Sequence, residues 1–469
     1  MLVAQCKAPA VVCTVLLTAA SMLTAQQASV PASRPQLSAF LHQAAETGLR
    51  SSGTGLYVGP GSCSAVACHG GIQPRSVTKV LQNESSTWVS EDRHAKAYAA
   101  LTGPQGVQMA RILKIGPADK AQRCLVCHAL SVPPRERARV FDISEGVSCE
   151  NCHGPASAWL GPHIEASAQH ARMVSLGLVD NKNLVVRAER CLTCHLGSGV
   201  PGMQVDHEMI AAGHPDLTFE LDSYTAVEPP HWLEKAPNAK EAIADPLFGV
   251  RAWAVGQAVQ LRESMLRLER RANDHAAPWP EFSEMDCFTC HHSLSGYQNS
   301  WRQKEGYPGR RPGDPPYNEA RFVVFRHLAL EADPSATHEL EGELQTVARL
   351  VTSMSSDRAR VAEGARGAAT HAAQLVTRMQ AMSYDRERNT RLLLAISADA
   401  DAISEQGERS AEQAAMTLDS LYIANARAGA VNESTRQAVN ALLQQLNNPS
   451  AYNAPQFAAQ MRKVHDSLR

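Results

Sequence analysis

The stretch that decides the fold is Gly146-Val147-Ser148-Cys149-Glu150-Asn151-Cys152-His153-Gly154-Pro155, in which two cysteines two residues apart are followed at once by a histidine. The same Cys-x-x-Cys-His spacing recurs at 124–128, 191–195 and 287–291. A fifth occurrence, at 63–69, leaves four residues between its cysteines instead of two. This repeated motif dominates the first two thirds of the 469-residue chain.

Cys-x-x-Cys-His is the pattern by which haem c is attached, because two thiols add to the two porphyrin vinyl groups and the next residue reaches the iron. Structural zinc does not require a histidine after every second cysteine, and a thioredoxin-like pair would need only one motif. We therefore predict five covalently attached haem c groups. The expected attachment residues are Cys63, Cys68, Cys124, Cys127, Cys149, Cys152, Cys191, Cys194, Cys287 and Cys290, and the expected proximal iron ligands are His69, His128, His153, His195 and His291.

The wide motif has a local alternative, because Cys63 and Cys68 of an exported protein could form a disulfide. Its two extra residues must loop out between the thioether bonds. Glycines at 61, 70 and 71 let the backbone approach a porphyrin ring. Since His69 keeps the position of an iron ligand, we favour haem attachment here too.

The remaining histidines decide whether any iron stays open to substrate. Two histidines per iron favour electron transfer, whereas an unfilled sixth position permits catalysis. Of the 18 histidines, eight beyond the motifs lie between residues 94 and 292. The expected distal ligands are His94, His163 and His214, with His207 and His231 as further candidates and His170, His275 and His292 in reserve.

Three segments carry a family resemblance: Trp88 to Tyr98, residues 146–155, and Ala211 to Pro215. Over roughly residues 60 to 295 the chain resembles the cytochrome c-554 family of multihaem proteins. That family is similar to the haem-packing core of hydroxylamine-oxidising and nitrite-reducing enzymes. The resemblance implies a mostly helical fold, closely stacked haem pairs and periplasmic electron shuttling, and it supports His94, His163 and His214 as distal ligands. Family members typically bear four haems, so the fifth motif and the wide spacing are departures.

The predicted fold class is mainly α, with a multihaem core of little regular structure followed by a C-terminal helical bundle of four to six helices. One helix, marked by apolar positions from Ala254 to Leu268, interrupts the haem region. The expected division of the chain is a signal peptide at 1–25, a lead-in at 26–55, a pentahaem domain at 56–300, a Pro/Gly-rich linker at 301–318 and a helical domain at 319–469.

The interrupting helix has a basic face. For its four arginines, Arg262, Arg267, Arg270 and Arg271, we favour solvation over pairing with haem propionates. For the C-terminal region, which has no cysteine, we favour packing or homo-oligomer formation over a partner-docking or site-capping role.

Function is expected to be electron transfer between periplasmic or membrane-bound redox proteins through the five haems. The alternative is an oxidoreductase acting on a small nitrogen or sulfur compound at one open haem. A net charge of -2, with 45 basic and 47 acidic residues, excludes the basic surface that nucleic acid would need. The N-terminal signal predicts a periplasmic or secreted protein, or an anchored one if the signal is retained.

Overall fold

The computed structural model describes residues 55–75, 80–197, 202–231, 245–287, 291, 315–353, 357–448 and 451–469. The predicted signal peptide, nearly all of the lead-in and most of the linker lie outside these ranges, as do Cys290 and His292. Within the described residues the regular structure is helical, and only two isolated β-bridges occur, Tyr57 with Arg137 and Met285 with Tyr317. The predicted mainly α class is confirmed. No helix among the described residues is long and apolar enough to cross a membrane.

Short helices separated by loops make up the motif-bearing region. Its 3-10 turns are η1 (Pro60–Ser62), η2 (His94–Lys96), η3 (Pro134–Glu136), η4 (Ile143–Glu145), η5 (Pro162–Ile164) and η6 (Phe282–Glu284). Its α-helices are α2 (Glu84–Glu91), α3 (Ala97–Thr102), α4 (Pro104–Leu113), α5 (Gln122–His128), α6 (Cys149–His153), α7 (His170–Ser175), α8 (Leu184–His195), α9 (His207–Ala211) and α10 (Leu221–Val227). Two small apolar clusters lie here, one around Leu101 and Leu125 and one around Trp159 and Met173. Apart from α8 and α10, which contribute to the main hydrophobic core, side chains alone therefore form little core in this region.

Helix α11 (Phe248–Asn273) is the long central element of the fold. It extends beyond the 254–268 stretch expected from periodicity, and almost all of its residues are buried, including Trp253, Ala258 and Leu268. Trp253 donates its ring N–H to Thr417 Oγ1 at 2.9 Å. A helix that is buried on nearly every side is an internal element. The helices that pack against α11 are α8, α10, α12 (Ala320–Val323), α13 (Phe325–Ala332), α15 (Arg358–Ala381) and α18 (Glu408–Arg427).

The C-terminal region folds into more helices than expected. The described residues from 320 onward contain α12 (Ala320–Val323), α13 (Phe325–Ala332), α14 (Pro334–Thr352), α15 (Arg358–Ala381), α16 (Arg386–Ala398), α17 (Ala400–Glu405), α18 (Glu408–Arg427), α19 (Glu433–Gln445) and α20 (Ala454–Ser467). Polar N-cap residues mark the start of several of these helices. In each case the first turn of the helix donates a backbone N–H to the side chain of the cap, which is Asp357, Asp385, Asn432 or Asn453. The prediction of four to six helices is wrong because these caps divide one apolar periodicity into shorter pieces.

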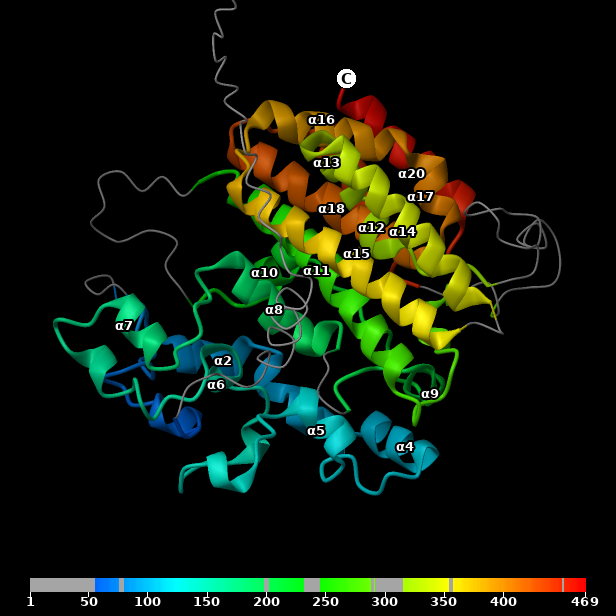
Figure 1. Cartoon of the computed structure of the whole chain (residues 1–469). Helices are drawn as coiled ribbons and strands as arrows, with labels where there is room; N and C mark the ends of the chain where they lie inside the picture. Colours follow the sequence, from blue (N-terminus) through cyan, green and yellow to red (C-terminus); the bar gives the residue numbers. More distant parts are fainter. Residues whose placement is uncertain are drawn as a thin grey trace, which may run out of the picture.

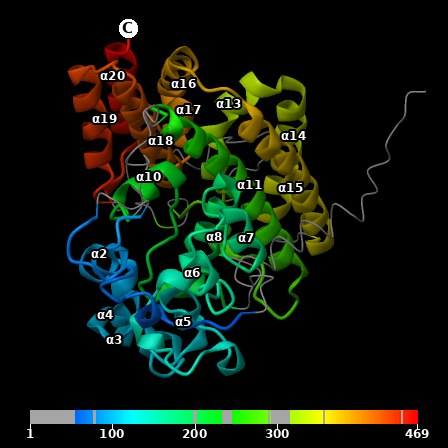
Figure 2. The same ribbon diagram turned by 90° about the vertical axis from the view of Figure 1, so that its left-hand side faces the viewer.

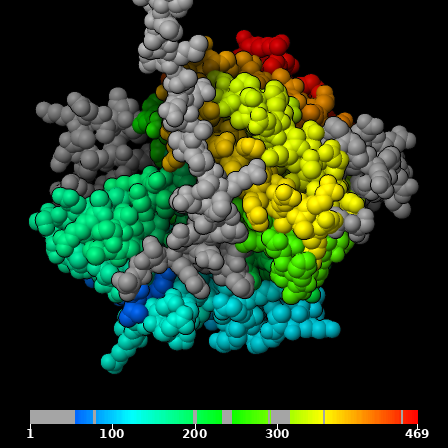
Figure 3. Space-filling model, viewed as in Figure 1, coloured from blue at the N-terminus to red at the C-terminus, as the bar shows by residue number. Residues whose placement is uncertain are grey.

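One hydrophobic core crosses the expected linker. It runs from Leu184 in α8 through α11 to Val464 in α20. Figures 1 and 2 show α8, α10 and α11 between the C-terminal helices and the segment from α2 to α6. In Figure 3 the yellow-to-red C-terminal helices sit directly above the cyan and green motif-bearing residues. Helices from before the linker thus share a core with helices from after it, and the domain limits themselves stay a prediction.

Candidate haem sites

Three of the motifs lie at helix C-termini. Helices α5, α6 and α8 end at His128, His153 and His195, respectively. Residues three apart on an α-helix share a face, so the two cysteines of each motif are neighbours on one turn and the histidine follows at the end. The spacing of the motif is therefore the spacing of a helical turn.

The wide motif is built differently. Residues 63–69 form turns, and the backbone N–H of His69 donates to Cys63 O at 3.2 Å, which closes the loop on itself. No disulfide joins Cys63 to Cys68 or any other pair of described cysteines. The local disulfide that the sequence left open is not formed in this structure.

The quoted stretch 146–155 is held by specific contacts. Gly146 has φ of 76°, and a Cβ there would lie 2.9 Å from His94 O. Glu150 is buried and accepts backbone N–H groups from Val58, Gly59 and Ala156 at 2.7 to 2.9 Å. Trp88 Nε1 donates to Val147 O at 3.1 Å. These contacts join two of the segments that carry the family resemblance.

Histidines form four pairs with nearly constant spacing. Each pair joins one predicted proximal ligand to one predicted distal ligand. The ring centroids are 6.3 Å apart for His69 and His163, 6.2 Å for His94 and His195, 6.3 Å for His128 and His214, and 6.4 Å for His207 and His291. The angles between ring planes are 13°, 80°, 90° and 32° in the same order.

This spacing fits two imidazoles on opposite sides of one metal ion. A metal–nitrogen bond of about 2 Å, and about 1.1 Å more from that nitrogen to the ring centre, place two trans imidazoles roughly 6 Å apart. Rings packed directly on each other would show a distance that changes with their mutual angle. Here the angle varies widely while the distance stays between 6.2 and 6.4 Å. The residues present therefore fit the irons predicted from the sequence.

Hydrogen bonds at Nδ1 orient several of these rings. The acceptors are Glu84 Oε2 for His69 at 2.9 Å, Asp92 Oδ1 for His94 at 3.0 Å, Ala97 O for His128 at 2.9 Å, Leu160 O for His163 at 2.5 Å and Pro215 O for His214 at 2.7 Å. A ring that donates from Nδ1 keeps the lone pair on Nε2 for a metal. His170 differs from these rings, because its Nε2 and not its Nδ1 contacts a carboxylate, Asp180 Oδ1, at 2.8 Å. His170 lies outside the four pairs.

The environments of the rings differ in charge. The hydrogen bond that His69 donates to Glu84 raises the pKa of His69, and the one that His94 donates to Asp92 raises the pKa of His94. Glu228 lies beside the second pair, because ligand atoms of Asp92, His94 and Glu228 fall within 4.8 Å of one another. Burial instead lowers the pKa of His153 and of His195 to about 4, which favours the neutral ring that binds metals.

The fifth predicted proximal ligand, His153, lies near His231. After burial, the charge of His231 is the largest cause that lowers the pKa of His153. His231 directs Nδ1 toward Pro229 O at 3.2 Å, in the manner of the oriented rings above. The reserve candidate His275 is exposed.

Thiol contacts show which motifs are neighbours. The thiol of Cys63 lies beside that of Cys149, and the thiol of Cys127 lies beside that of Cys194. Burial, followed by the charges of Glu228 and Cys191, raises the pKa of the Cys152 thiol, so the motifs at 149–153 and 191–195 also lie close. Motif order in space therefore differs from motif order in sequence.

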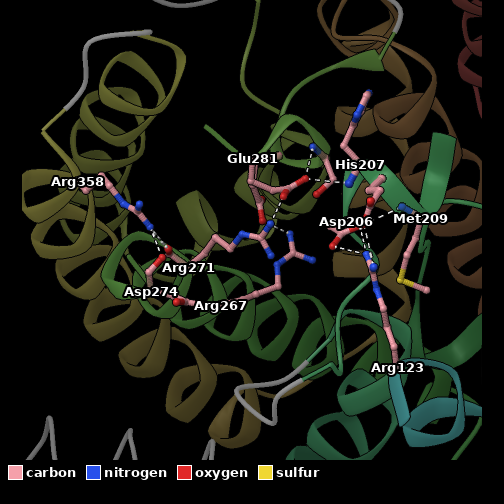
Figure 4. Close-up of polar contacts among 12 residues, drawn as sticks. Arg123, Asp206, His207, Met209, Arg267, Arg271, Asp274, Glu281 and Arg358 are labelled. Atoms are coloured by element: carbon pink, nitrogen blue, oxygen red, sulfur yellow. Dashed lines mark hydrogen bonds and ion pairs between the residues drawn. The ribbon is translucent and has the colours of Figure 1, made fainter. Parts of the chain in front are cut away.

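Beside the motif at 287–291, an ion-pair network fixes His207, which pairs with His291. Asp206 caps α9 by accepting from Met209 N at 3.0 Å, and it binds Arg123 Nη2 at 2.7 Å. Glu281 Oε1 accepts the backbone N–H of His207 at 2.9 Å, while its Oε2 accepts from Arg271. Figure 4 shows these groups converging from α5, α9, α11 and the segment after α11.

The expectation of a solvated basic face on α11 is wrong. Arg262, Arg267 and Arg271 are buried. Arg262 pairs with Glu189 at 2.5 Å, and Arg267 pairs with Glu284 at 2.6 Å. Arg267 also donates to Leu196 O at 2.7 Å, next to His195. Sequence reasoning missed these glutamates, which precede or follow the motifs and gave no periodic signal.

Comparison with known families gives the class of this region. Residues 63–154 match the family model described as cytochrome c554 and c-prime, which is a family of multihaem c-type cytochromes. It includes the motifs at 63–69, 124–128 and 149–153. The family binds haem c covalently and serves in electron transfer, and c-type cytochromes are in general extracytoplasmic. No curated protein and no solved structure matches the chain.

Proposed function

We propose that this protein transfers electrons between periplasmic or membrane-bound redox partners through five haem c groups, each held between two histidines. Two histidines would hold each haem: His69 with His163, His128 with His214, His153 with His231, His195 with His94, and His291 with His207. The observation that carries the proposal is the constant 6.2 to 6.4 Å spacing of the four ring pairs. Haem c bound at these residues supplies reversible one-electron oxidation and reduction of its iron.

A proposed order of the sites follows from their contacts. The thiol contacts support neighbouring positions for the motifs at 63–69 and 149–153, and for those at 124–128 and 191–195. Arg123 contacts Asp206, which adjoins His207. This contact supports a position for the site of His207 and His291 beside the motif at 124–128. The sites would then form one continuous row, which is what a conductor needs.

The chain's own residues would set the differences in reduction potential between the sites. Carboxylates at Nδ1 of His69 and His94 would make those imidazoles stronger donors to a bound iron and would thereby favour its oxidised state. Carbonyl acceptors at His128, His163 and His214 do so less. The potentials along the row would therefore be unequal, and carboxylate placement would tune them.

The alternative function, oxidation or reduction of a small nitrogen or sulfur compound, needs an iron with one open position. The histidines available at the five motifs supply a second ring in each case, if His231 serves His153. Electron transfer is therefore the function that the geometry supports best.

Removal of one distal ring tests the proposal. His214→Gly takes the partner from His128, so electron paramagnetic resonance of the oxidised protein should gain a high-spin signal from one haem. His170→Gly is the control, because His170 binds Asp180 and lies outside the pairs, and its spectrum should stay unchanged. The mass of the exported protein should also exceed that of its chain by five haems. An all-low-spin spectrum for His214→Gly would contradict the assigned pairing.

A further inference from the structure

A cavity of about 150 Å³ lies among α11, α12 and α14, within the helical region and apart from the histidine pairs. Apolar side chains form much of its wall, including Met265 of α11, Phe322 of α12 and Leu344 of α14. Polar side chains complete it, with Arg321, Glu319 and Gln406 among them.

Arg321 gives this cavity its chemistry. Its side chain is buried, at 9 % exposure, and Nη1 reaches no hydrogen-bond partner. No described residue forms a hydrogen bond or an ion pair with its guanidinium. An arginine stays protonated in proteins, and a buried charge without full compensation is unfavourable. The carboxylate of Glu284 acts on Arg321, but Glu284 is already paired with Arg267 at 2.6 Å, so one carboxylate serves two buried arginines. The other three buried arginines of the described chain, Arg262, Arg267 and Arg271, each have a glutamate partner.

Polar groups near Arg321 indicate which kind of ligand could neutralise its charge. Gln406 donates from Nε2 to Glu319 Oε2 at 3.2 Å, and its own Oε1 is buried without a partner in the described chain. Arg326 binds Asp399 at 3.2 Å through Nη2, but its buried Nε is also unbonded among described groups. The wall therefore offers two arginine donors, one amide acceptor without a partner, and the carboxylates of Glu319 and Glu341, of which Glu319 is already bonded to Gln406.

We propose that this cavity binds a small hydroxycarboxylate, whose carboxylate pairs with Arg321 and whose hydroxyl donates to Gln406 Oε1. Arginine presents a planar fork that matches a carboxylate. A cavity of about 150 Å³ is known to hold a molecule of benzene's size, or about six heavy atoms. L-lactate has that size and both groups. Ordered water alone would fill the volume but would leave the guanidinium charge unpaired.

The proposal is independent of the electron-transfer function, so either can fail alone. Isothermal titration of the haem-loaded full chain with L-lactate, acetate and sulfate should show saturable binding of one lactate per chain. Acetate should bind at least threefold more weakly, because it has no hydroxyl for Gln406. Sulfate should bind more weakly still, because its further charged oxygens would lie against the apolar wall formed by Met265, Phe322 and Leu344.

Variants separate the ligand site from a merely packed cavity. Arg321→Gln should weaken lactate binding at least tenfold, and Arg360→Gln, an exposed arginine on α15, should leave it unchanged. Gln406→Ala should abolish the preference for lactate over acetate even if Arg321→Gln fails to fold. Absence of saturable lactate binding to the unmodified protein, or equal binding by Arg321→Gln, would overturn the proposal and leave water as the occupant.

Discussion

Glu281 joins a predicted iron ligand to the central helix, because its carboxylate accepts the backbone N–H of His207 at 2.9 Å and also binds Arg271. Both Glu281 and Arg271 are buried. The position of His207, which pairs with His291, is therefore fixed by an ion pair that α11 provides and not by α9 alone.

Glu281→Ala should be strongly destabilising. Removal of one partner leaves the Arg271 charge buried, which costs about 3 kcal/mol in the free energy of unfolding. Chemical denaturation followed by circular dichroism measures the change. The control is Glu208→Ala, because the pair of Glu208 with Arg123 is largely exposed and should contribute less than about 1 kcal/mol. Equal effects of the two substitutions would show that burial of the Glu281 pair has no energetic consequence.

Glu84→Gln should raise the reduction potential of the site at 63–69. The variant keeps an acceptor for His69 Nδ1 but removes the negative charge, so the oxidised iron is less stabilised. A change of about 1 kcal/mol corresponds to roughly 40 mV for a one-electron couple. Spectroelectrochemical titration should resolve the shift, whereas Asp180→Asn, beside His170, should move no potential. A shift to lower potential in Glu84→Gln would contradict the proposed role of the carboxylate.

Gly146→Ala should disturb the site of His94. A Cβ at this residue meets His94 O at 2.9 Å, and the positive φ adds strain. Gly429 has φ of 88°, but a Cβ there would meet nothing within 4 Å. Gly429→Ala therefore measures the cost of the positive φ alone. We expect Gly146→Ala to cost about 1 to 3 kcal/mol more than the control by thermal unfolding. If both lose the same stability, the close approach to His94 is not a packing constraint.

Glu220 should make the helical core less stable as pH rises. Burial raises its pKa to about 7 from an ordinary 4.5. Between these values the unfolded chain releases a proton that the folded chain retains, so the free energy of unfolding falls as pH increases from 4.5 to 7. The loss is on the order of 3 kcal/mol and is absent below the lower value.

Glu220→Gln removes that titration while it keeps an oxygen for the first turn of α10. Stability relative to the unmodified protein should rise with pH through this window and level off above it. Denaturation at pH 4.5, 6 and 8 measures the difference. Glu363→Gln, an exposed position on α15, should parallel the unmodified protein at every pH. A constant offset for Glu220→Gln would contradict the assignment.

Local chemistry in the sequence was enough to predict the motifs and the mainly α class. The motif at 149–153 needs only one helical turn, which its own residues form. The pairing of His94 with His195 was beyond sequence reasoning, because it depends on how distant loops fold around a site. The burial of Arg262 was missed for a similar reason, since its partner Glu189 lies on another helix. Cap residues such as Asp357 are visible in the sequence, but the apolar periodicity continues on both sides of them, so the number of helices was underestimated.

The most direct test of two-histidine ligation is electron paramagnetic resonance of the oxidised, unmodified protein, with spins counted against haem content. We predict five low-spin haems whose spectrum is unchanged by nitrite, hydroxylamine or sulfite. A high-spin haem that responds to one of these compounds would show an open iron and contradict the account.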